Sequence, residues 1–191
     1  MSGYLYLIIG PMFAGKSSKI IRLIRLFKSK NVPTLVIKHS IDTRYSIDTI
    51  CSHDKITEPC VTSDNLIKYI DKEEYKKSEI IVIEEAQFFA EDLIEFCTRA
   101  VDVDNKYLIV TGLSGDHKRK PFGYILDLIP LANKIDYLEA YCDLCDDNVA
   151  APFTLKLLGT HDIIEVGESN LYKPVCRKHY LESINSRLES I

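Results

Sequence analysis

The segment that most constrains this chain runs from residue 10 to residue 17 and reads Gly-Pro-Met-Phe-Ala-Gly-Lys-Ser. A short apolar run that favours β-structure, residues 4–9, precedes it directly. In residues 18–30, which follow it, apolar side chains recur at near-helical spacing. The pattern Gly-x-x-x-x-Gly-Lys-Ser between a strand and a helix is the arrangement that wraps backbone N–H groups around phosphates. The sequence therefore predicts a nucleotide-binding loop.

Each residue type in this loop has a physical role. The glycines let the backbone turn its N–H groups toward the phosphates. The Lys16 ammonium reaches the β- and γ-phosphates, and the Ser17 hydroxyl is a ligand for Mg²⁺. We therefore predict ATP and Mg²⁺ as cofactors and assign the whole loop to their site: Gly10, Pro11, Met12, Phe13, Ala14, Gly15, Lys16 and Ser17.

The rest of the chain alternates strand-like and helix-like segments. Buried strands are predicted at 34–38, 80–84 and 107–111, and helices at 63–70, 91–101 and 124–132, with a mobile loop over 40–58. Because the strands lack polar alternation, we expect a mainly parallel sheet with helices on both faces. This is the α/β class of P-loop NTPases.

Two adjacent acids, Glu84 and Glu85, end the predicted strand 80–84. In phosphate-transferring enzymes an acid at the end of a neighbouring buried strand helps to hold Mg²⁺, and a carboxylate near the acceptor takes its proton. A solvated strand end is the alternative interpretation. The phosphate loop favours the functional one.

Cys142-x-x-Cys145 and Cys176-x-x-His179 offer four soft ligands. Zn²⁺ prefers a tetrahedral set of sulfur and nitrogen, and a closed set of four protein ligands is structural. We predict a nucleotide-binding domain over residues 1–136 and a small zinc domain over residues 137–191. Two unrelated thiol pairs and a zinc-bound reader of nucleic acid are the alternatives.

The formal net charge of −4 gives no support to a nucleic-acid partner, which usually meets a basic face. No apolar run approaches a membrane-spanning length, and no secretory signal opens the chain. The chain is therefore expected to be soluble and cytoplasmic, with no nucleic-acid or membrane partner.

The chain resembles the type II, cytosolic-type thymidine kinases nearly from end to end. The segments that carry the resemblance are, besides the phosphate loop, Asp-Thr-Arg-Tyr-Ser (42–46), Ser-His-Asp (52–54), Glu-Glu-Ala-Gln-Phe-Phe (84–89), Lys-Arg-Lys-Pro-Phe-Gly (118–123) and Tyr-Lys-Pro-Val-Cys-Arg-Lys-His (172–179). The resemblance implies a P-loop domain and a small zinc domain with a loop that closes over the substrate.

The resemblance also implies roles for single residues. Glu85 is expected to be the general base that deprotonates the 5′-hydroxyl, with Gln87 beside it in the nucleotide site. Asp42, Thr43 and Arg44 are expected to complete the phosphate and magnesium site together with Glu84. On the residues alone, Asp42 and Arg44 fit a surface ion pair equally well.

The thymine pocket implied by the family consists of Met12, Phe88, His117, Phe122 and Tyr172. On the residues alone, Phe88 and Phe122 fit an ordinary core. The closing loop aligns with Ile163, Ile164, Glu165, Val166 and Gly167, whose backbone groups would read the polar edge of thymine.

Three positions depart from the family pattern. Glu84 stands where Asp is usual, His117 where an aromatic residue is frequent, and Gly167-Glu168 where two glycines are common. These positions bear on magnesium geometry, base preference and the closing loop.

The expected reaction is phosphoryl transfer from ATP to thymidine in nucleoside salvage, with deoxyuridine as second substrate. The family implies a homotetramer inhibited by thymidine triphosphate. Two alternatives stay open: an ATPase that acts on nucleic acid and a kinase of another small alcohol.

Overall fold

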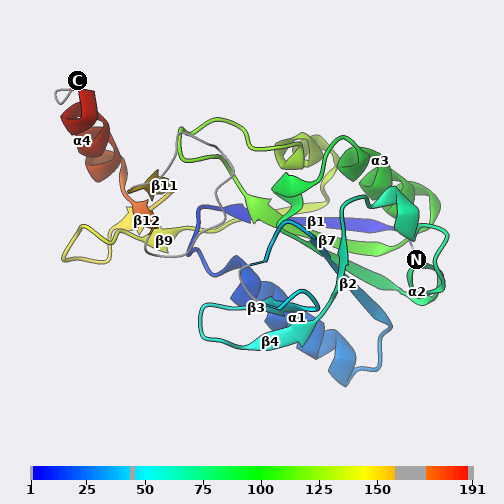
Figure 1. Ribbon diagram of the computed structural model, residues 1–191. Helices are drawn as coiled ribbons and strands as arrows, with labels where there is room; N and C mark the ends of the chain where they lie inside the picture. The colour runs from blue at the N-terminus through cyan, green and yellow to red at the C-terminus, as the bar shows by residue number, and fades with distance from the viewer. Residues whose placement is uncertain (1, 44–45, 158–170, 189–191) are drawn as a thin grey trace.

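The computed structural model describes residues 2–43, 46–157 and 171–188. Six strands form one sheet in the order β5-β2-β6-β7-β1-β8, and every pairing is parallel (Figure 1). The predicted α/β class with a mainly parallel sheet is confirmed. The strands are β1 (Tyr4–Gly10), β2 (Thr34–His39), β5 (Val61–Ser63), β6 (Ile80–Glu84), β7 (Tyr107–Leu113) and β8 (Lys134–Tyr137).

Helices cover both faces of this sheet, which is why its strands carry apolar residues on both sides. Ile20, Ile21 and Ile24 of α1 pack on one face, and Leu93 and Phe96 of α3 pack on the other. Figure 1 shows α1 and α3 on opposite sides of the strands. The helical elements of this part are α1 (Lys16–Ser29), α2 (Glu73–Lys77), α3 (Asp92–Thr98) and the π-helical turn Arg99–Val103.

A small lobe with its own core lies beyond the end of the sheet (Figure 1). It pairs β9 (Ala140–Tyr141) with β10 (Ala150–Ala151) and β11 (Phe153–Lys156) with β12 (Tyr172–Val175), and ends in α4 (Arg177–Leu188). The domain boundary between residues 136 and 137 stays a prediction. In the structure β8, which belongs to the large sheet, includes Tyr137.

The loop predicted over residues 40–58 contains a β-hairpin, so that prediction is wrong for this part. The hairpin pairs β3 (Thr49–Cys51) with β4 (Thr57–Pro59). Ile50 is 1% exposed and joins the core under α1. Glu58 accepts hydrogen bonds at 2.6 Å from both Arg25 and Lys28 of α1. Contacts of this kind join distant segments, so a local hydropathy pattern does not show them.

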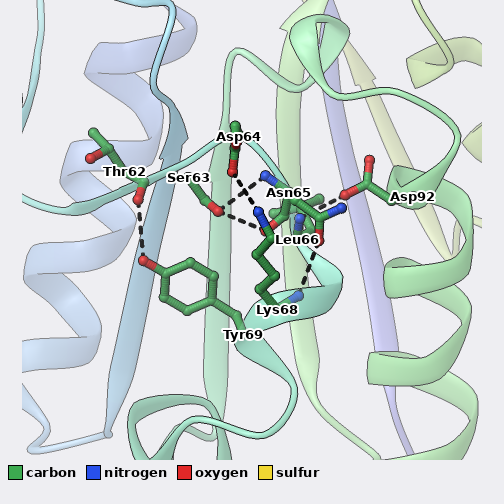
Figure 2. A network of polar contacts seen from close by, with 8 residues as sticks. All are labelled: Thr62, Ser63, Asp64, Asn65, Leu66, Lys68, Tyr69 and Asp92. Carbon is green, nitrogen blue, oxygen red and sulfur yellow. Dashed lines mark hydrogen bonds and ion pairs between the residues drawn. The ribbon is translucent and has the colours of Figure 1, made fainter.

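The helix predicted over residues 63–70 is also wrong, because side chains satisfy the backbone groups of this segment one by one. The Asn65 side chain accepts the backbone N–H of Lys68, at 3.1 Å, within the single 3₁₀ turn Ile67–Tyr69. The Asp92 carboxylate accepts the backbone N–H of Leu66 at 2.6 Å (Figure 2). The segment is thereby tied to α3.

The predicted helix 124–132 is present as a 3₁₀ helix, Ile125–Leu131. Pro130 lies inside it and has no N–H to donate, which disfavours a regular α-helix there. Within the described ranges, no helix has both the length and the apolar character needed to cross a bilayer.

We predict that Glu58→Gln lowers the free energy of unfolding by about 1–2 kcal/mol at pH 7, because it weakens two charged hydrogen bonds. Burial raises the pKa of Glu58, but the bonds from Lys28 and Arg25 outweigh it and place the pKa below its ordinary 4.5. The ionised Glu58 carboxylate therefore stabilises the fold at pH values above its ordinary pKa of 4.5. The difference from wild type should disappear as the pH falls through the lowered pKa.

Urea unfolding of both proteins from pH 7 down to acid pH measures this difference. The control is Glu73→Gln, which removes only exposed ion pairs to Lys76 and Lys77 and should cost less than about 0.5 kcal/mol. Equal losses in the two variants at pH 7 would contradict the anchoring role of Glu58.

Candidate active site

A cavity of about 540 Å³ lies between the carboxyl ends of the strands and the small lobe. Its described walls come from the phosphate loop, the ends of β6 and β7, the β3–β4 hairpin, the segment 113–122 and the lobe. Ligands of open parallel sheets bind at this edge, because the loops that follow the strands converge there.

The phosphate loop forms one wall. Gly15 has φ 77°, the left-handed conformation that glycine adopts without strain, and a side chain on it would point into open space. Lys16 is 9% exposed and donates from Nζ to the carbonyl oxygens of Gly10 at 3.3 Å and of Pro11 at 2.6 Å. Residues Met12 to Ser17 line the cavity. Gly10 and Pro11 are not among its described lining residues, and their carbonyl oxygens bind Lys16.

Glu84 and Ser17 meet at the floor of the cavity. The Ser17 hydroxyl donates to Oε1 of Glu84 at 2.6 Å, and Glu84 is 4% exposed. The solvated strand end considered above is therefore excluded. A hydroxyl and a carboxylate side by side are hard oxygen donors that suit Mg²⁺. The Glu84 side chain, which is one methylene longer than that of Asp, reaches the Ser17 hydroxyl directly.

Glu85 leaves the extended conformation of β6, with φ 53° and ψ 44°. Left-handed backbone is strained in a residue with a side chain, and such strain concentrates at functional sites. Its carboxylate accepts a hydrogen bond at 2.6 Å from Nε2 of Gln87, whose Oε1 accepts the backbone N–H of Leu113 at 3.0 Å. Gln87 thus fixes Glu85 relative to the end of β7.

Two glycines leave room for Gln87. A Cβ added to Gly112 would stand 2.3 Å from Gln87 Oε1, and one added to Gly123 would stand 2.2 Å from the Gln87 carbonyl oxygen. Neither distance is possible for real atoms, so a side chain at either position would displace Gln87. Gln87 therefore packs against Gly112 and Gly123 more closely than a side chain at either position would allow.

The segment after β2 contributes Asp42, which lines the cavity and is 4% exposed. The surface ion pair considered for Asp42 is excluded by this burial. Thr43 is exposed and is not among the described residues that line the cavity. Arg44 lies outside the described residues, and so does the predicted closing loop from Ile163 to Gly167.

Aromatic side chains form another part of the cavity wall. Phe88 and Phe122 pack edge to face with centroids 5.6 Å apart, and both are half-buried and line the cavity. They are therefore not ordinary core residues. Met12, His117 and Tyr172 line the same cavity, so every described member of the predicted base pocket is brought together there.

Several residues that line this cavity were not among the predicted site residues. The buried Thr154 of β11 accepts the backbone N–H of Met12 at 3.0 Å, which joins the lobe to the phosphate loop. Asp54, Asp116 and Tyr141 also line the cavity. Only Asp54 lies in a segment, Ser-His-Asp, that the family resemblance had marked.

The four predicted zinc ligands gather in the lobe. Their ligand atoms lie within 4.8 Å of one another, with His179 Nδ1 at 3.4 Å from each of the three sulfurs and the Cys145 and Cys176 sulfurs 3.9 Å apart. Tetrahedral Zn²⁺ requires edges of about 3.6 Å between nitrogen and sulfur and about 3.8 Å between sulfurs. The cluster fits this ion.

The backbone around the cluster prepares one thiol for metal binding. Burial raises the pKa of the Cys142 thiol, but backbone hydrogen bonds from Cys176 and Leu144 outweigh it and lower the pKa below its usual value. The Cys176 N–H lies 3.2 Å from the Cys142 sulfur. Such bonds to the ligand sulfur orient it toward the ion.

Comparison with known proteins agrees with this geometry. The sequence model of the family described as thymidine kinase matches residues 3–180. Thymidine kinase a of Arabidopsis thaliana is 41% identical over 183 residues, which cover 94% of this chain and 76% of that protein. The thymidine kinase of rabbit fibroma virus (strain Kasza) is 40% identical over 178 residues, 93% of this chain and 96% of that protein.

The thymidine kinase of Variola virus (isolate Human/India/Ind3/1967) is 40% identical over 182 residues, 95% of this chain and 98% of that protein. These matches span the phosphate loop, the acids after β6 and the metal cluster alike. The chain belongs to the thymidine kinase family.

Proposed function

We propose that this protein transfers the γ-phosphoryl group of ATP to the 5′-hydroxyl of thymidine, with deoxyuridine as a second substrate, and thereby salvages a DNA precursor. The observation that carries the proposal is the cavity that joins the phosphate loop, two buried carboxylates and an aromatic wall. Thymine and uracil differ by one methyl group, so a pocket separates them by only about 1–3 kcal/mol.

The phosphate side of the cavity positions ATP. The loop N–H groups and the start of α1 face the phosphates, and Lys16 neutralises charge on the transferred group. Ser17 and Glu84 would hold Mg²⁺, with Asp42 nearby and Arg44 completing the site. When bound, Mg²⁺ would neutralise the negative charge that develops on the transferred phosphoryl group. The chain's own contribution is the fixed distance between Ser17 and Glu84.

Glu85 is the proposed general base. Its carboxylate is 9% exposed and oriented by Gln87, so it can accept the proton of the 5′-hydroxyl as that oxygen attacks. Phe88, Phe122 and Met12 would hold the planar base, and His117 and Tyr172 close the pocket. The backbone of residues 163–167 is proposed to read the polar edge of the base, as the family implies.

The Cys₃His cluster is proposed to hold a structural Zn²⁺, since four protein ligands leave no open position for a substrate. Thiolate ligands of this kind persist in a reducing compartment, which supports a cytoplasmic location. A homotetramer and inhibition by thymidine triphosphate are the remaining parts of the proposal, and they rest on the family alone.

Replacing Glu85 by Gln tests the proposed base. The amide keeps the shape of the side chain but accepts no proton, so kcat should fall by about 10²–10⁴ while KM for thymidine and ATP changes little. Steady-state measurement of thymidine monophosphate formation checks this. Glu74→Gln, an exposed acid of α2, is the control and should retain full activity. A Glu85→Gln enzyme with more than a tenth of the wild-type kcat would contradict the role.

Replacing His117 by Phe tests base selectivity. Imidazole can accept a hydrogen bond from the amino group of cytosine, whereas a phenyl ring leaves that group unpaired. The ratio of kcat/KM for thymidine to that for deoxycytidine should therefore rise roughly fivefold. Parallel assays with both nucleosides measure the ratio. An unchanged ratio would show that His117 does not contact the base.

Replacing Cys142 by Ser tests the metal. Mass spectrometry of the purified proteins should find one zinc per wild-type chain and little in the variant, which should also unfold at lower temperature because the lobe has a small core. Cys60→Ser is the control: burial raises the pKa of that thiol to about 12, and it lies outside the cluster. Equal zinc in Cys142→Ser and wild type would refute the site.

A further inference from the structure

Tyr180 connects the metal cluster to the wall of the cavity by a single hydrogen bond. It follows the ligand His179 in the first turn of α4 and is 2% exposed. Its hydroxyl donates to the carbonyl oxygen of His117 at 2.8 Å. The residues are 63 apart in sequence, so the bond joins two separate parts of the chain.

The lobe holds the Tyr180 ring in place on several sides. Its backbone N–H donates to the carbonyl oxygen of the ligand Cys176 at 3.0 Å. The ring packs on Phe153 of β11 with centroids 5.4 Å apart. The guanidinium carbon of Arg119, from the segment 113–122 of the cavity wall, lies 4.5 Å from its centroid. The position of the hydroxyl therefore follows the position of the cluster.

The other end of the bond lies in a tight turn of the cavity wall. The buried Asp116 accepts the backbone N–H groups of Lys118 and Lys120, each at 2.8 Å, and its own N–H donates to the Lys120 carbonyl at 2.9 Å. These bonds fix the turn internally. The bond from Tyr180 adds an external attachment at His117, which lines the cavity and is assigned to the proposed base pocket.

We propose that Tyr180 is a positioning residue that sets the nucleoside side of the cavity from the Cys₃His cluster. This inference rests on the proposed function, because it assigns the base to the wall at His117. The phosphate loop has a separate attachment to the lobe, the hydrogen bond from the Met12 N–H to Thr154, which Tyr180 does not touch. Loss of the Tyr180 hydroxyl should therefore affect the nucleoside and spare ATP.

Tyr180→Phe tests the proposal, because it keeps the packed ring and removes only the hydroxyl. The matched control is Tyr75→Phe. Tyr75 is also 2% exposed and donates at 2.7 Å, to Asp104, but it lies in α2, away from the cavity. Each protein is first checked for its zinc content and then assayed with thymidine and ATP varied in turn.

KM for thymidine should rise roughly fivefold in Tyr180→Phe, with kcat and KM for ATP within about twofold of wild type and full zinc content. Tyr75→Phe should leave all these constants unchanged. The inference is overturned if KM for thymidine stays the same, if KM for ATP rises equally, or if zinc is lost.

Hydrogen exchange of the zinc-loaded proteins provides a readout that needs no activity. The backbone amides of residues 116–120 should exchange faster in Tyr180→Phe than in wild type and Tyr75→Phe, because the turn loses its hydrogen bond to the lobe while the ring contacts of Arg119 remain. Unchanged exchange there overturns the inference. A wild-type enzyme that phosphorylates no thymidine refutes the proposed function instead, and the exchange data still decide whether Tyr180 holds the turn.

Discussion

The candidate active site depends on the parallel alignment of β1, β7, β6 and β2. Because these strands run in one direction, the phosphate loop, the paired acids and the segment with Asp42 all leave the sheet at the same edge. The hydrogen bond from Ser17, which follows β1, to Glu84, the last residue of β6, forms there although β7 lies between these two strands. β6 remains fully buried up to that point, so its first polar side chain already stands in the site.

The left-handed turn at Glu85 explains how two adjacent acids serve one cavity. Successive side chains of an extended strand point to opposite faces, so a continued β6 would direct Glu84 and Glu85 apart. Both line the cavity because the backbone turns at Glu85. Conformations of this kind cost about 1–3 kcal/mol and persist only where the surroundings enforce them. Here the enforcing contacts come from Gln87, which is held in turn by the end of β7.

Local patterns were enough to predict the four central strands β1, β2, β6 and β7, the phosphate loop and the metal ligands, since each is written in a short stretch of sequence. The short outer strands β5 and β8 were not predicted, because they are partly exposed and lack a continuous apolar run. The errors fall where distant side chains decide the structure. The β3–β4 hairpin depends on Glu58 meeting α1, and Asp92 binds the segment expected to be a helix. Thr154 and Tyr180 escaped notice because a threonine in a strand and a tyrosine in a helix are ordinary residues until their partners are known.

The small lobe contacts the cavity at two places although it contributes neither Glu84 nor the proposed base Glu85. It is joined to the phosphate loop through Thr154 and to the cavity wall at His117 through Tyr180, so it contacts two separate parts of one cavity. Its own apolar core is small, and a lobe of this size needs a further constraint to keep a fixed shape. A closed Cys₃His site supplies that constraint without offering a position for chemistry. If the proposals above hold, a structural metal would influence substrate binding, because the lobe that it stabilises holds two parts of the cavity wall.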